Sequence, residues 1–117
     1  MDLPGEGDDE FYAVGGLSQT ESVWVCGTGG ALYGCDGDRW IEHDSGTEDT
    51  LSGICCTGPE DRWVTTSNGQ LRHWDGHEWD VAAFSPSGYL SGVCSVDGEV
   101  WAVGKDGAVI RHRPHLQ

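Results

Sequence analysis

LSGICCTGPEDRWVTTSNGQLRHWDGHEWDVAAFSPSG, residues 51–88, is the stretch that decides the fold of this chain. It contains four short runs rich in apolar and β-branched residues: LSGICC, DRWVTT, QLRHW and EWDVAAF. The segments TGPE, SNG and DGH separate these runs. Short apolar runs punctuated by Gly, Pro, Asn and Asp are typical of consecutive antiparallel strands joined by tight turns. The stretch therefore predicts a four-stranded antiparallel unit.

The same pattern occurs before and after this unit. Trp24, Trp63 and Trp101 are separated by thirty-nine and thirty-eight residues. The same shifts align Gly30 with Gly69, Leu32 with Leu71, Asp36-Gly37 with Asp75-Gly76, Trp40 with Trp79, and Leu51 with Leu90. A period near forty residues with four strands per unit is typical of β-propeller blades. We therefore predict an all-β fold made of propeller blades, each with four antiparallel strands.

The repeats resemble those of bacterial and archaeal β-propellers. DRWVTTSNGQLRHWDGHEW and EVWAVGKDGAVIRH are similar to the repeat pattern D-V-W-A-V-G-x-x-G-x-I-L-H-W-D-G-x-x-W. Tectonin-type lectin repeats and sialidase-like repeats are more distant in pattern. The resemblance covers residues 11 to about 112 and implies a propeller fold. It does not identify a function, because propellers include lectins, hydrolases and scaffolds for partner proteins.

The repeats divide the chain into blades. We expect residues 1–10 to form a flexible acidic lead-in, 11–50 blade one, 51–89 blade two, and 90–117 an incomplete blade three. Gln117 stands where the repeat would place Trp79, so blade three lacks its fourth strand. The chain thus encodes about 2.75 blades, whereas propellers close with four to eight. We expect closure by oligomerisation, with a six-bladed homodimer favoured; the alternative is a fragment of a larger propeller.

The composition excludes several partners. Twenty acidic residues oppose six basic ones, which gives a net charge of −14. Such a surface repels phosphate backbones, so we expect no nucleic-acid partner. The near-absence of lysine favours a halophilic, haloarchaeal source over an ordinary acidic cytosolic protein. The chain has neither an apolar run long enough to span a membrane nor a signal-peptide pattern. We therefore expect a cytoplasmic protein with no membrane partner.

The signatures of common enzymes and metal sites are absent from the sequence. The segment 27–30, GTGG, lacks the third glycine and the following helix of a dinucleotide-binding motif. The five cysteines show no C-x-x-C spacing, and we expect Cys55 and Cys94, which share a slot in the innermost strand, to be small buried apolar groups. His73 and His112 also share a slot, but a zinc site needs three or four ligands. We expect no cofactor and no metal.

A binding surface is the function that these observations favour. In each blade, the connections after the second and fourth strands emerge on one face, around the mouth of the propeller channel. Polar side chains with an exposed aromatic ring suit a glycan or a peptide. The candidate binding residues on this face are Glu48, Asp49, Asn68, Tyr89 and Asp106. We therefore predict a non-enzymatic, lectin-like or protein-binding module. Two alternatives are a degenerate sialidase-like hydrolase that uses Glu48 or Asp49, and a ligand-free self-assembling propeller fragment.

Overall fold

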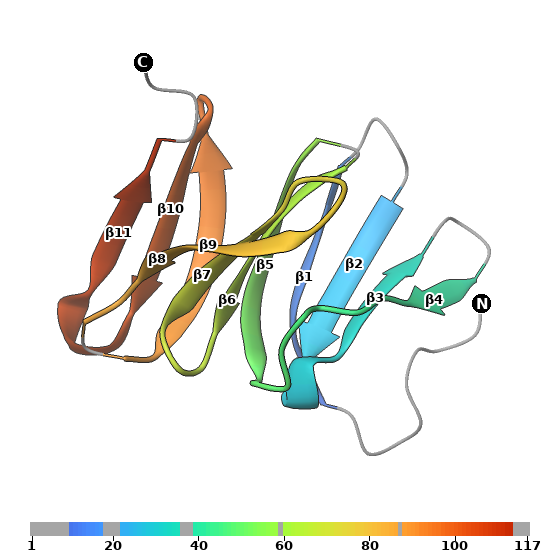
Figure 1. The fold of residues 1–117 in the computed structure, drawn as a ribbon, viewed down its shortest axis with the longest axis horizontal. Helices are drawn as coiled ribbons and strands as arrows, with labels where there is room; N and C mark the ends of the chain where they lie inside the picture. The colour runs from blue at the N-terminus through green and yellow to red at the C-terminus, as the bar shows by residue number, and fades with distance from the viewer. Residues whose placement is uncertain (1–9, 18–21, 36–38, 59, 87, 114–117) are drawn as a thin grey trace.

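The computed structural model describes residues 10–17, 22–35, 39–58, 60–86 and 88–113. Within them, eleven strands form three antiparallel sheets in which each strand pairs with the next along the chain (Figure 1). The first sheet holds β1 (Phe11–Leu17), β2 (Ser22–Gly27), β3 (Leu32–Cys35) and β4 (Trp40–Glu42). The second holds β5 (Leu51–Gly58), β6 (Asp61–Thr66), β7 (Gln70–Trp74) and β8 (Trp79–Phe84). The third holds β9 (Leu90–Val96), β10 (Glu99–Gly104) and β11 (Val109–His112).

The sheets stack side by side as successive blades. β5 of blade two packs between β1 of blade one and β9 of blade three, so the first strands of the blades lie next to one another (Figure 1). Short 3₁₀ turns, η1 (Thr28–Gly30) and η2 (Lys105–Gly107), connect β2 to β3 and β10 to β11. The predicted all-β fold of four-stranded antiparallel blades is confirmed.

Two apolar clusters hold the blades together, one at each blade-to-blade interface. Neighbouring residues of β5 point to opposite faces of their sheet, so that Ile54 contributes to one cluster and Cys55 to the other. The cluster between blades one and two consists of Trp24, Cys26, Leu32, Leu51, Ile54 and Val64. The cluster between blades two and three consists of Cys55, Trp63, Leu71, Leu90, Val100 and Ala102. Blade two is therefore apolar on both faces.

The prediction that Cys55 and Cys94 are both buried is half correct. Cys55 is buried between blades two and three, whereas Cys94 is exposed. Both occupy the slot of the first strand that pairs with the repeat tryptophan, Cys55 with Trp63 and Cys94 with Trp101. That slot faces the following blade, and among the described residues no blade follows blade three.

A polar network anchors the central tryptophan of blade two. The His73 ring stacks on Trp63 at 3.9 Å between centroids and hydrogen-bonds the Asp61 carboxylate. The Trp63 indole N–H donates to Thr57 Oγ1 at 3.3 Å, and the Thr57 hydroxyl donates to Asp61. Trp63 is thereby fixed in the interface while its polar edge stays hydrogen-bonded.

The turns follow the predicted chemistry where they are described. Gly76 adopts a φ of +99°, and the Asp75 carboxylate accepts the backbone N–H groups of His77 and Glu78 at 2.8 and 2.9 Å. This geometry closes the β7–β8 hairpin. The lead-in at residues 1–9, the turn at 36–38 and residues 114–117 lie outside the described residues. No helix in the described part of the chain is long and apolar enough to cross a membrane.

Candidate functional site

The loop face predicted to surround the channel mouth is built from connections that dock on one another. The Ser45 hydroxyl, on the connection between blades one and two, donates to Gly30 O at 2.7 Å. The Ser67 N–H of the β6–β7 turn donates to Thr50 O at 2.9 Å. Lys105 N–H donates to Tyr89 O at 3.0 Å. The first bond holds the connection against blade one, and the other two join neighbouring blades.

The five predicted site residues lie on four connections of this face, with Glu48 and Asp49 on the same one. Thr66 Oγ1 donates to Asn68 Oδ1 at 2.5 Å, and Thr47 Oγ1 donates to Asp49 Oδ2 at 3.3 Å. These two bonds stabilise the β6–β7 turn and the β4–β5 connection, in which the residues lie. Glu48 and Tyr89 are exposed, and Asp106 sits in η2 with a φ of +59°. The structure places the five along one face; their part in binding stays a prediction.

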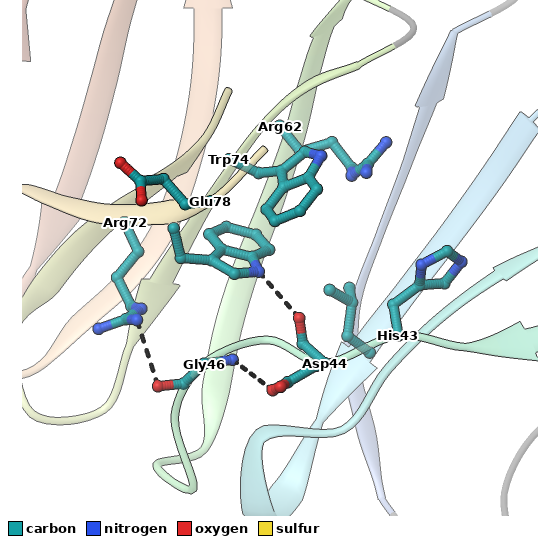
Figure 2. A pocket seen from close by; sticks show the side chains of 9 residues that line it. His43, Asp44, Gly46, Arg62, Arg72, Trp74 and Glu78 are labelled. Atoms are coloured by element: carbon teal, nitrogen blue, oxygen red, sulfur yellow. Dashed lines mark hydrogen bonds between the residues drawn. The ribbon is translucent and has the colours of Figure 1, made fainter. Parts of the chain in front are cut away.

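A different site is visible between blades one and two. A cleft of about 470 Å³ opens there, on the side of the outer strands (Figure 2). Its volume is within the range of small-ligand pockets, ~300–1,000 Å³. Its lining comes from β3, the segment after β4, and blade two. The lining residues are Leu32, His43, Asp44, Gly46, Arg62, Arg72, Trp74, Glu78 and Trp79. We refer to this pocket as the inter-blade cleft.

Hydrogen bonds from blade two fix one wall of the cleft. The indole N–H of Trp79 donates to Asp44 O at 2.8 Å, and Arg72 Nη2 donates to Gly46 O at 3.3 Å (Figure 2). The Asp44 carboxylate accepts the Gly46 N–H at 2.8 Å. The Trp79 ring that makes the contact with Asp44 O lies 5.6 Å from the ring of Trp74, at 48°. One indole of the cleft is thus bonded to the pinned backbone, and the second lies beside it.

A buried arginine closes the inner end of the cleft. Arg62 is only 6% exposed, and its guanidinium lies 4.1 Å from the Trp24 ring and 5.8 Å from the Trp74 ring. Burial lowers the pKa of Arg62, against the opposing charge of Glu60. Burial also lowers the pKa of His43, and the charge of Arg62 lowers it further. The Arg62 guanidinium therefore places a buried positive charge at the inner end of a cleft whose lining also includes Arg72 and the carboxylates of Asp44 and Glu78.

The repeat supplies an internal control for these residues. Register places Arg62 opposite Trp74, where blade one has Val23 opposite Cys35 and blade three has Val100 opposite His112. The slot of Arg72 is likewise filled by Tyr33 in blade one and Ile110 in blade three. Burying a cation in place of valine costs several kcal/mol in desolvation, on the order of magnitude for ions in protein interiors. Departures of this kind from a consistent pattern are expected at functional sites.

Two buried hydrogen-bond donors in the lining of the cleft have no partner. Arg72 Nε and Trp74 Nε1 are buried and have no hydrogen-bond partner. A buried donor without a partner costs about 1–3 kcal/mol. These two donors favour a ligand that presents hydrogen-bond acceptors, such as carbonyl oxygens. Sequence reasoning missed this site, although aligning Arg62 with Val23 and Val100 would have indicated it.

One group of carboxylates among the described residues could hold a metal ion by its spacing. The ligand atoms of Asp75, Glu78 and Asp80 lie within 4.8 Å of one another, and all three residues are exposed. Backbone N–H groups of Glu78 and His77 lower the pKa of Asp75. These bonds account for Asp75 as part of the β7–β8 turn.

Comparison with known proteins identifies the fold. The structure is similar to that of YCF48 bound to D1 peptide, with a TM-score of 0.72 and 14% sequence identity over 90% of this chain and 37% of that chain. It is also similar to YCF48 from Cyanidioschyzon merolae, with a TM-score of 0.73 and 18% identity over 94% of this chain and 36% of that chain. YCF48 is a β-propeller protein, and the chain spans just over a third of it. The predicted partial propeller is confirmed.

Comparisons of sequence give no match. No protein-family model matches the chain, and no curated protein matches it.

Proposed function

We propose that this chain is a non-enzymatic binding module that holds a protein segment in the inter-blade cleft. The observation that carries this proposal is the replacement of apolar repeat positions by Arg62 and Arg72 in blade two alone of the three blades. The same blade adds Trp74 beside the Trp79 ring. Such an arrangement costs stability and serves no repeat-wide packing role, which favours a role in recognition.

A peptide fits the chemistry of the cleft better than a glycan. A peptide presents a carbonyl acceptor at every residue, and Asp, Glu and the C-terminus add carboxylates. Arginine binds carboxylates in a bidentate manner, and indole rings pack against apolar side chains. One structural neighbour, YCF48, was solved bound to D1 peptide, which is compatible with this choice. The likeness itself concerns only the fold.

The proposal can be tested with a fluorescent library of random twelve-residue peptides and, in parallel, a glycan array. Arg72→Gln should weaken peptide binding by about tenfold or more, because it removes a charged donor worth roughly 1.5–3 kcal/mol. Arg113→Gln is the control, since it removes one exposed positive charge, paired with Glu99 of blade three, that does not line the cleft. Its affinity should stay within about twofold of the parent.

The same assay separates the inter-blade cleft from the channel mouth. Tyr89→Ala and Asn68→Ala should leave peptide affinity unchanged if the cleft is the site. Loss of binding in these two variants, with Arg72→Gln unaffected, would move the site to the loop face. If the protein bound glycans and no peptide, the ligand would be a glycan and not the proposed peptide.

The hydrolase alternative has less support. A glycosidase needs a carboxylic acid whose pKa is raised so that it can donate a proton. The described carboxyl groups with a shifted pKa, Asp61, Asp75 and Glu99, are all shifted downward. Release of nitrophenol from chromogenic glycosides, abolished by Glu48→Gln or Asp49→Asn, would revive this alternative. We propose in addition that copies of the chain associate, through the surfaces described next.

A further inference from the structure

Blade two shows how consecutive blades pack, and that packing serves as a template. The tryptophan of the second strand pairs with one residue of the first strand in every blade: Trp24 with Gly15, Trp63 with Cys55, and Trp101 with Cys94. The three blades therefore share one register. In both observed interfaces, this tryptophan and the leucine of the third strand pack against the first and second strands of the following blade.

Blade three carries, on its outer face, the side of this interface that the tryptophan and the third strand form. Among the described residues, no further blade packs against it. Its equivalents of Leu32 and Cys26 are Val109 and Val103, which are 62% and 47% exposed. Leu32 and Cys26, by contrast, are 1% and 0% exposed. The face of blade three that points away from blade two is therefore an apolar surface in the position of a blade-to-blade contact.

Blade one presents the other half. Its equivalents of Ile54 and Arg62 are Val14 and Val23, which are 67% and 41% exposed. In blade two, Ile54 is 5% exposed against blade one. A single chain thus carries both complementary halves of one interface, at opposite ends of its stack of blades (Figure 1).

The repeat tryptophans show the same difference between the inner interfaces and the outer face of blade three. Trp24 is covered by Arg62 of the following blade at 4.1 Å, and Trp63 contacts His112 of the following blade at 5.2 Å between ring centroids. Trp101 has a contact with Arg111 of its own blade at 5.3 Å, in the slot where His73 stacks on Trp63. The cover that the next blade provides in the two inner interfaces is absent from the described residues at Trp101.

We propose that the far face of blade three packs against the open face of blade one of a second copy of this chain. Repeated twice, this head-to-tail contact closes a ring of two chains. The described residues of two chains contribute six sheets, which is within the four to eight blades of known propellers, whereas those of three chains would contribute nine. The second copy is favoured as the occupant because its blade one has the register, the apolar residues and the strand order that blade three matches.

Salt should control the association. Each copy carries a net charge of −14, so two copies repel each other through solvent at low ionic strength. The contact combines the exposed valines with Arg111, which lies over Trp101. Salt shortens the range of the repulsion between the two acidic copies to about 3 Å at 1 M. The dimer should therefore form more strongly at molar salt than at 0.05 M.

The experiment is light scattering on the full chain at 0.05 M and 1 M salt, over a range of concentrations. The expected mass at 1 M salt is twice the 12.6 kDa of one chain. Val14→Lys and Val109→Glu, each alone, should weaken dimerisation by about 100-fold, because each places an unpaired charge in the contact. Both substitutions in one chain should restore it, because a head-to-tail contact places the new lysine near the new glutamate. Val81→Glu, an exposed valine on β8 of the central blade, is the matched control and should leave the dimer intact.

Each outcome is decisive. Near-ultraviolet circular dichroism reports whether each variant keeps its packed tryptophans, and exposed valines are chosen so that the fold survives. A monomer at every salt concentration would overturn the proposal. A dimer that the double variant fails to restore would also overturn it, since a symmetric contact between two copies of blade three would bring glutamate against glutamate.

Discussion

Replacing Arg62 by methionine tests whether the buried charge serves binding at the expense of stability. The substitution removes the contact of the guanidinium with Trp24 at 4.1 Å, worth about 2 kcal/mol in a desolvated setting. It also removes the desolvation cost of an ion that is 6% exposed, which amounts to several kcal/mol. Methionine fills a similar volume and adapts to irregular surroundings.

The second effect is the larger one, so the free energy of unfolding should stay constant or rise by about 1–3 kcal/mol. For a chain of this size that corresponds to a Tm increase of roughly 4 °C per kcal/mol. Urea unfolding followed by tryptophan fluorescence measures the stability. Fluorescence anisotropy with the best peptide from the library measures the affinity, which should fall by about tenfold or more because the cleft loses its buried charge.

Arg113→Met is the control for this prediction, because Arg113 is exposed and loss of a surface ion pair such as that with Glu99 costs at most about 1 kcal/mol. The reasoning would be refuted if Arg62→Met destabilised the chain by more than about 1 kcal/mol while peptide affinity stayed the same. Arg62 would then be a packing residue of blades one and two, and the repeat comparison would have pointed to structure instead of binding.

Further predictions concern the core, a turn and pH. Trp63→Ala, which truncates a side chain that is 1% exposed, should lower the free energy of unfolding by about 3–5 kcal/mol; a loss below about 1 kcal/mol in urea unfolding would contradict the packing described. Gly69→Ala should also destabilise, because φ is +91° and a Cβ would lie 2.3 Å from Gly88 O; an unchanged Tm would show that the two connections separate easily. The pKa values of His43 and His112 are lowered, in both cases mainly by burial. The unfolded state therefore binds more protons than the folded one, and stability should fall as the pH drops below about 6.5. Combining His43→Gln with His112→Gln should flatten this dependence, and an unchanged slope would exclude these two groups as its cause.

The sequence predicted the strands and their grouping because both depend on local signals. Turn dipeptides and apolar runs recur with a fixed period, and three copies of the pattern allow each strand to be placed by its neighbours. The burial of Cys94 could not be judged in this way, because burial depends on which blades are present and not on the strand itself. The same slot is buried at Cys55 and exposed at Cys94.

The inter-blade cleft was missed for a related reason. Its residues come from different strands, and only the register shows that Arg62 lies opposite Trp74. The predicted residues Asn68 and Tyr89 were chosen as polar or aromatic side chains on loops, a criterion that ordinary turns also satisfy. The position of Arg62 within the repeat is the more selective signal, because the packing role of that slot is known from the other two blades.

The two proposals predict different consequences for the two faces of each blade. The interface between blades one and two tolerates a buried arginine because Trp24, Leu32, Ile54 and Val64 still supply an apolar cluster around it. The open faces of blades one and three have no such compensation, and apolar surface in these positions is stabilising only once covered. If copies associate as proposed, the ring would contain two inter-blade clefts related by the two-fold axis. Val109→Glu would then leave the peptide affinity of a single cleft unchanged but remove any gain from bivalent ligands. Titration with a monovalent and a tandem peptide would distinguish the two effects: equal losses for both would mean that ring closure shapes the cleft itself.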